Sequence, residues 1–95
     1  MVNEKHIISQ ICNYLKLDPE WLTDGSRERY IVDARQIAMY LIRKHTDNSF
    51  PMIGQLFNRS HSTVIHSCKK VKEISDVNKR YKALIMDIER SITNQ

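Results

Sequence analysis

The sequence has 95 residues, of which 41% are hydrophobic and 27% are charged, so it is long enough for one hydrophobic core and too short for two. Its net charge is +4, and nine of its lysine and arginine residues lie between Ser26 and Lys72, where there are only three acidic residues, which favours an anionic partner. No apolar run approaches the roughly 18 residues that cross a membrane, and the first residues lack the basic start and continuous apolar core typical of a signal peptide. Both cysteines lie within apolar segments. We therefore expect a cytoplasmic protein without a membrane partner and with reduced thiols.

The spacing of apolar residues predicts helices throughout the chain and no strands. Only two glycines and two prolines interrupt the sequence, and no alternating apolar-polar run is long enough for a strand. From the N-terminus we expect a first helix over residues 4–17, a short helical turn over 18–22, a central helix over 30–45 and a last helix over 77–92. The predicted fold class is therefore all-α, a compact single domain over residues 1–95 with about six helices.

Two further helices are predicted in the basic middle of the chain. Ser49 is placed to cap a helix of barely two turns that ends at Phe57. Asn58 then suits a tight turn, because asparagine adopts left-handed backbone geometry more readily than most residues. Ser60 is placed to cap the next helix. A short helix, a tight turn and a second helix form the layout of a helix-turn-helix, which we expect over about residues 49–75.

The first turn of that second helix is polar and carries little bulk. In a helix-turn-helix this turn meets base edges in the major groove, where hydroxyl and imidazole groups can donate and accept hydrogen bonds. The groups available there belong to Ser60, His61, Ser62 and Thr63. The positive end of the helix dipole would also face phosphate. Any capped surface helix begins with similar residues, so these residues alone leave a second interpretation open.

One long run, ARQIAMYLIRKHTDNSFPMIGQLFNRSHSTVIHSCKKV, resembles the C-terminal DNA-binding domain, domain IV, of the bacterial replication initiator DnaA. The most specific similarity is in the central helix (Ala34 to Leu41), in Ser49-x-Pro51-x-Ile53-Gly54 and in Arg59-x-His61-Ser62-Thr63-Val64. It extends more loosely over nearly the whole chain. The resemblance implies a Trp-repressor-like fold that binds double-stranded DNA at short asymmetric sites called DnaA boxes. Because nothing in the sequence resembles a long coiled-coil seam, we expect one monomer on each site. It implies a role in replication initiation or its regulation, on the nucleoid.

The resemblance also implies which residues contact DNA. Arg27 matches an arginine that enters the minor groove, and Arg29 is a close second. Base contacts are expected from Arg27, Ser60, His61 and Ser62. Contacts with the DNA backbone are expected from Arg29, Arg35, Gln36, Arg43, Ser49, Pro51, Arg59, Thr63, Lys69 and Lys70, the two lysines by their charge alone.

Two positions depart from the family pattern, since Ser60 replaces the usual aspartate and Asn58 replaces one or two glycines. A carboxylate only accepts hydrogen bonds, whereas a serine hydroxyl also donates. We therefore expect this substitution to relax or change the preferred DNA site. Overall affinity is expected to change less, because phosphate contacts supply much of it.

Enzymatic activity is not expected. Gly25 and Gly54 are the only glycines, so the glycine-rich phosphate loop of an ATPase is absent, and no cofactor is expected. His61 and His66 point in different directions on a helix and have no further ligands at suitable spacing, so no metal is expected. The chain is either the DNA-binding domain of a longer initiator or a free-standing relative.

Three interpretations of function remain open at this stage. The first is sequence-specific DNA binding in replication initiation, with other initiation proteins as candidate partners. The second is a transcriptional regulator with the same DNA chemistry. The third is a protein-interaction module on the same helical scaffold. The sequence does not separate the first two, because they differ only in where the DNA sites lie.

Overall fold

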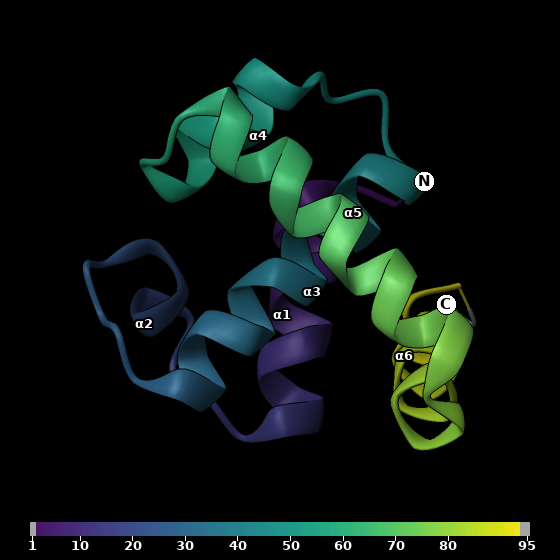
Figure 1. Ribbon diagram of the computed structural model, residues 1–95. Helices are drawn as coiled ribbons and strands as arrows, with labels where there is room; N and C mark the ends of the chain where they lie inside the picture. Colours follow the sequence, from purple (N-terminus) through teal and green to yellow (C-terminus); the bar gives the residue numbers. More distant parts are fainter. Residues whose placement is uncertain (1, 94–95) are drawn as a thin grey trace.

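Residues 2–93 are described by a computed structural model, in which they form six helices and no strand (Figure 1). The helices are α1 (Glu4–Leu15), α2 (Pro19–Thr23), α3 (Arg29–His45), α4 (Phe50–Phe57), α5 (His61–Val77) and α6 (Lys79–Thr93). The predicted all-α helix-turn-helix fold is confirmed. None of these helices is long and apolar enough to cross a membrane.

Polar side chains cap the beginnings of several helices at the positions that the sequence predicts. The carboxylate of Asp18 accepts the backbone N–H of Glu20 at 2.9 Å, and the hydroxyl of Ser49 accepts that of Met52 at 3.3 Å. Ser60 caps α5 in the same way. These bonds satisfy N–H groups that have no partner inside the helix, so local residues determine where α2, α4 and α5 begin.

Two predicted helix boundaries are wrong by two residues. Helix α1 ends at Leu15 because Lys16 adopts left-handed geometry, with φ of 58°, and the N–H of Leu17 bonds to the Cys12 carbonyl at 2.9 Å. Helix α6 begins late because α5 continues to Val77. Asn78 alone separates these two helices, and its side chain accepts the N–H of a residue in the first turn of α6 at 3.0 Å.

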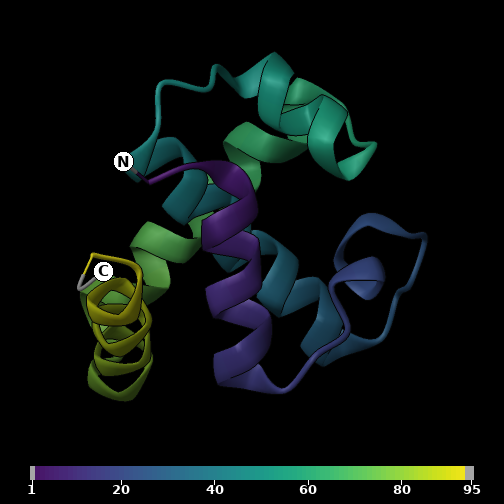
Figure 2. The same cartoon turned by 180° about the vertical axis from the view of Figure 1, so that it is seen from behind.

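Helix α3 lies at the centre of the fold, and the other helices pack around it (Figures 1 and 2). Helices α1, α2, α4 and α5 pack on α3, whereas α6 packs on α1 and α5 and reaches α3 through Glu89, which bonds to Lys44 and His45. The residues of α3 that form the core are Ile31, Ala34, Ile37, Ala38, Met39, Leu41 and Ile42. Because α3 follows the basic loop and supports α4 and α5, it connects the two parts of the site described below.

Candidate nucleic-acid interface

Helices α4 and α5 form the predicted helix-turn-helix, joined by residues 58–60. Asn58 adopts left-handed geometry with φ of 55° and ψ of 47°. This conformation brings the backbone N–H of Arg59 to 2.8 Å from the carbonyl of Gly54. Helices commonly end at a residue in this left-handed conformation, which is usually glycine and sometimes asparagine. Asparagine therefore suffices here without a glycine.

Gly54 lets the turn approach α4 closely. A β-carbon at this position would lie 2.5 Å from the carbonyl oxygen of Arg59 and 3.5 Å from the backbone nitrogen of His61. Both atoms belong to the backbone, so they cannot swing away as a side chain would. The angle between α4 and α5 therefore depends on the missing side chain.

The first turn of α5 presents polar groups to solvent. Ser60, His61, Ser62 and Thr63 are all exposed, whereas Val64 is fully buried beneath them. The hydroxyl of Ser60 accepts the Thr63 N–H at 3.3 Å and lies 3.0 Å from the Thr63 hydroxyl. The turn is therefore held in place from below by the core, and its upper surface offers hydroxyls and an imidazole.

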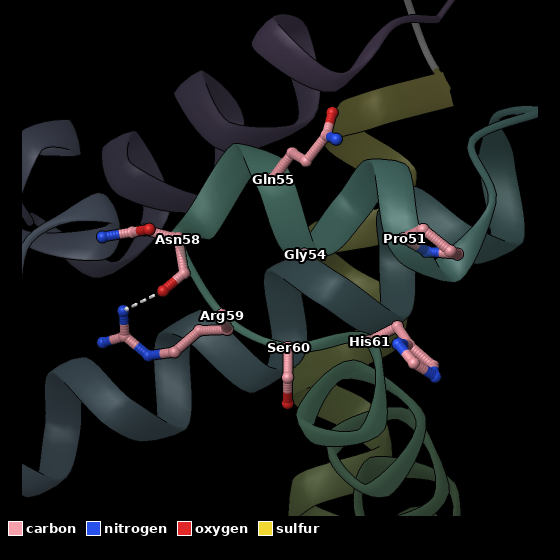
Figure 3. A pocket seen from close by; sticks show the side chains of 7 residues that line it. All are labelled: Pro51, Gly54, Gln55, Asn58, Arg59, Ser60 and His61. Atoms are coloured by element: carbon pink, nitrogen blue, oxygen red, sulfur yellow. Dashed lines mark hydrogen bonds between the residues drawn. The ribbon is translucent and has the colours of Figure 1, made fainter.

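A hollow of about 450 Å³ lies between α4 and this first turn, and Figure 3 shows the residues that surround it. They are Pro51, Gly54, Gln55, Asn58, Arg59, Ser60 and His61. Gln55 and Asn58 are exposed, and neither is predicted from the sequence to contact DNA. Only the folded arrangement places them around the same hollow as Ser60 and His61.

The basic loop after α2 lies on the same side of the molecule as the α4–α5 turn, on the left in Figure 1 and on the right in Figure 2. Its Arg27 is exposed and, within residues 2–93, makes no hydrogen bond or ion pair with the protein. Arg29 is also exposed and lies 3.6 Å from the Asp33 carboxylate, a surface pair that adds little stability. Arg27 is thus the freer of the two arginines to contact a ligand.

Arg35 is bonded inside the protein, and its expected contact with the DNA backbone stays a prediction. Arg35 is only 5% exposed, and its guanidinium donates to four backbone carbonyls. These belong to Leu22 (2.7 Å), Trp21 (3.1 Å), Ser26 (3.2 Å) and Asp24 (3.4 Å). Burial lowers the pKa of Arg35, nearby Arg59 lowers it further, and the Asp24 carboxylate opposes these effects. Arg35 therefore organises α2 and the basic loop from inside the protein.

Arg59 connects the basic loop to the helix-turn-helix. Its Nη1 donates to the carbonyls of Phe57 at 2.9 Å and Asn58 at 3.2 Å, and Figure 3 draws the second of these bonds. Its Nη2 donates to the Asp24 carbonyl at 3.2 Å. Arg59 was expected to contact the DNA backbone, and that contact stays a prediction, while the structure adds these contacts within the protein.

The remaining predicted residues lie around this surface. Arg43 donates to the Asn48 carbonyl at 3.1 Å, and its guanidinium stands 4.3 Å from the centre of the Phe50 ring, so it supports the segment before α4. Ser49 caps α4, exposed Pro51 lies in its first turn, and Gln36 is half-buried on α3. Lys69 and Lys70 are exposed and follow Ser62 and Thr63 by seven residues, so each pair shares a side of α5.

Within the described part of the chain, no three histidine, cysteine, aspartate or glutamate side chains are grouped closely enough to hold a metal ion. Burial raises the pKa of the Cys12 and Cys68 thiols. Since the thiolate is the form that binds metals and attacks substrates, burial makes both thiols less reactive at neutral pH.

Comparison with known proteins identifies the family. The model of the family described as "Bacterial dnaA protein helix-turn-helix" matches residues 5–71. Three relatives, each called "Chromosomal replication initiator protein DnaA", illustrate the similarity. The protein of Bacteroides thetaiotaomicron is 40% identical over 84 residues, which cover 87% of this chain and 18% of the relative. That of Thermus thermophilus is 38% identical over 88 residues, covering 92% and 20% respectively.

The third relative, from a Picosynechococcus species, is 45% identical over 76 residues, which cover 79% of this chain and 17% of the relative. The chain thus spans about a fifth of the length of the curated relatives it matches. The matched segment contains the basic loop, α3, α4 and the first half of α5. This chain belongs to the family of bacterial DnaA helix-turn-helix domains.

Proposed function

We propose that this chain binds double-stranded DNA in a sequence-specific manner, with the first turn of α5 in the major groove and the basic loop in the minor groove. Membership of the DnaA helix-turn-helix family indicates DNA binding in replication initiation. One observation supports this arrangement most strongly. The polar first turn of α5 and the basic loop lie on one side of the molecule, Arg27 in that loop is exposed, and Arg59 joins the two segments.

The major groove suits the first turn of α5 because each base pair presents a distinct set of donors and acceptors there. The Ser60, His61 and Ser62 side chains reach that groove as short, polar groups. The Ser60 hydroxyl accepts the Thr63 N–H and lies 3.0 Å from the Thr63 hydroxyl. When the Thr63 hydroxyl donates that bond, the Ser60 proton is available for a base. It can therefore face acceptors on guanine, adenine or thymine, and we propose a preferred site related to a DnaA box but different at that base pair.

The minor groove suits Arg27 because this groove has a strong negative potential where it is narrow, which attracts arginine. Arg27 is the exposed side chain at the tip of a loop whose backbone is held by Arg35. A guanidinium on a short, fixed loop can enter a groove about 6 Å wide without moving the rest of the domain. Arg29 then lies beside the DNA backbone.

Phosphate contacts would surround the first turn of α5 and the basic loop. The N-termini of α4 and α5 point partial positive charge at the same region, and Lys69 and Lys70 extend the charge along α5. A single module of this size covers about 600–1,000 Å² of protein surface, so we propose that one monomer occupies each site and that neighbouring sites raise the total affinity. The proposed location is the nucleoid in the cytoplasm, and the proposed role of this segment is binding without catalysis.

Selection from a library of random DNA duplexes at near-physiological salt tests the proposal. We expect one short asymmetric consensus. On that site, Arg27→Ala and His61→Ala should each lower the affinity by about tenfold or more, because a good base contact is worth about 1–3 kcal/mol of discrimination. On an unrelated duplex both variants should bind almost as the original chain does.

Lys70→Ala is the matched control, because it removes a charge without removing a base contact. It should weaken binding to both duplexes and reduce the dependence of log K on log salt by about one. If Arg27→Ala and His61→Ala bound the selected site as tightly as the original chain, the assigned reading surface would be wrong. Absence of binding to any duplex at low salt would instead favour a protein-interaction module.

A further inference from the structure

Two arginines from different parts of the fold converge on the backbone of the loop between α2 and α3. The Asp24 carbonyl accepts Nη2 of Arg59 at 3.2 Å and Nη2 of Arg35 at 3.4 Å. Arg35 belongs to α3, whereas Arg59 belongs to the turn of the helix-turn-helix and lies 35 residues along the chain from Asp24. The loop is therefore attached to the central helix α3 through Arg35 and to the helix-turn-helix through Arg59.

We propose that Arg59 is a positioning residue that couples the basic loop to the helix-turn-helix, and thereby sets where Arg27 stands relative to the first turn of α5. This inference rests on the proposed DNA binding and deepens it. It assigns to Arg59 a role in sequence selectivity that acts through another residue. A direct contact between Arg59 and DNA is not needed for this role.

The shape of the guanidinium fits this role. Nη1 bonds to the carbonyls of Phe57 and Asn58, at the end of α4, while Nη2 of the same planar group reaches Asp24. Carbonyls at the end of a helix have no partners inside the helix, and Arg59 supplies donors to them. The same guanidinium also bonds to the loop. A lysine is a compact point donor without this fork, so it cannot make both sets of bonds in a fixed plane.

Further bonds fix the loop backbone on both sides of Arg27. The N–H of Ser26 bonds to the Asp24 carboxylate at 2.8 Å, and that of Glu28 bonds to the Ser26 hydroxyl at 3.4 Å. The Ser26 carbonyl accepts Nη2 of Arg35 at 3.2 Å. The backbone at Arg27 is thus ordered before any ligand arrives, and only its side chain remains to be ordered on binding.

Order that exists before binding raises affinity, because the entropy of arranging the loop is not lost again in the complex. If the bridge to Asp24 is removed, the loop keeps its link to α3 but loses its link to the turn. Arg27 then no longer has a fixed distance to the first turn of α5. We therefore expect the effect of removing Arg59 to depend on whether Arg27 is present.

A double-mutant cycle on the selected duplex measures this dependence. Arg59→Ala should lower the affinity by about tenfold in the original chain and by only about two- to threefold in the Arg27→Ala background, as expected for coupled neighbours. Lys70→Ala, the matched control on α5, should lower the affinity by the same factor in both backgrounds. If the factor for Arg59→Ala were also the same in both, the proposed coupling would be refuted.

Arg59→Lys separates position from charge. Under the proposal this variant binds the selected duplex about as weakly as Arg59→Ala does, because it keeps the charge and loses the fork. Recovery to the affinity of the original chain would mean that Arg59 acts as a cation near phosphate and would overturn the proposal. Melting curves followed by circular dichroism identify any variant that does not fold, and the lysine variant then carries the comparison.

Hydrogen exchange in the free protein tests the bridge without DNA. Backbone amides of residues 24–28 should exchange faster in Arg59→Lys than in the original chain, while those in the middle of α5 stay protected. Unchanged exchange in the loop would show that the bridge does not hold it and would overturn the proposal. Failure of the original chain to select any duplex would refute the proposed function instead, and the exchange result would still decide whether Arg59 fixes the loop.

Discussion

Replacing Gly54 by alanine should destabilise the protein, although alanine is the better residue for the interior of a helix. Gly54 is buried in α4, and a β-carbon there would lie 2.5 Å from the carbonyl oxygen of Arg59. This distance is about 1 Å shorter than an ordinary contact between such atoms. Because the obstructing atom belongs to the backbone, α4 and the turn must move apart to admit the methyl group.

The structure allows the size of this effect to be worked out. Alanine in place of glycine stabilises a helix interior by about 1 kcal/mol. Inserting a carbon into a tightly packed position costs about 1–3 kcal/mol. The same movement stretches the 2.8 Å bond from the Arg59 N–H to the Gly54 carbonyl, and a bond of this kind contributes about 1 kcal/mol. The free energy of unfolding should therefore fall by about 1–3 kcal/mol.

Urea denaturation followed by circular dichroism provides the assay, and Gly25→Ala is the matched control. Gly25 is the other glycine of the chain, and a β-carbon there would have no atom within 4 Å. We expect Gly25→Ala to remain within about 0.5 kcal/mol of the original chain. For a domain of this size, each 1 kcal/mol lost by Gly54→Ala should lower the melting temperature by about 4–8 °C. Equal unfolding midpoints for the two alanine variants would refute the reasoning.

Two further changes probe other parts of the structure. Arg35→Met should lower the free energy of unfolding by about 2–3 kcal/mol, because it leaves buried carbonyls without donors. The control Arg29→Met breaks only an exposed ion pair and should change that free energy by less than about 0.5 kcal/mol. Similar melting curves for the two variants would contradict the structural role of Arg35. Burial tends to raise the pKa of Glu89, but bonds to Lys44 and His45 outweigh burial and lower this pKa. The ionised carboxylate therefore stabilises the fold at pH values above the ordinary glutamate pKa of about 4.3. That stability is lost as the pH falls through the lower pKa of the folded state. Unfolding measured from pH 6 down to pH values well below that ordinary pKa should therefore show a shallower loss of stability in Glu89→Gln than in the original chain, and parallel curves would contradict the assignment.

The helix-turn-helix could be predicted from the sequence because its boundaries are encoded locally. Ser49 and Ser60 each accept an N–H only three residues further on, and the left-handed turn at Asn58 depends on its own residue type. The exposed first turn of α5 follows from the buried Val64 that ends it. Signals of this kind lie within one window of sequence, and they do not need the rest of the fold.

The roles of Arg35 and Arg59 could not be predicted in this way, because their partners are backbone carbonyls far along the chain. Arg35 reaches carbonyls 9 to 14 residues earlier, and Arg59 reaches Asp24 across 35 residues. Every residue has a carbonyl, so no residue type in the sequence indicates where a buried guanidinium will find its acceptors. In a chain with a basic middle, such arginines look the same as those that bind phosphate.

Burial and hydrogen bonding separate these two uses of arginine once the fold is known. Arg27 is exposed and unpaired within residues 2–93, so its charge is available to a ligand. Arg35 is 5% exposed and bonded to four carbonyls, so its guanidinium stabilises the fold. Arg59 has both features, since it is half-buried at the edge of the reading surface and bonded to the loop that carries Arg27. An arginine in that position can transmit a change in the loop to the first turn of α5, which a phosphate-binding lysine on the open face of α5 cannot do.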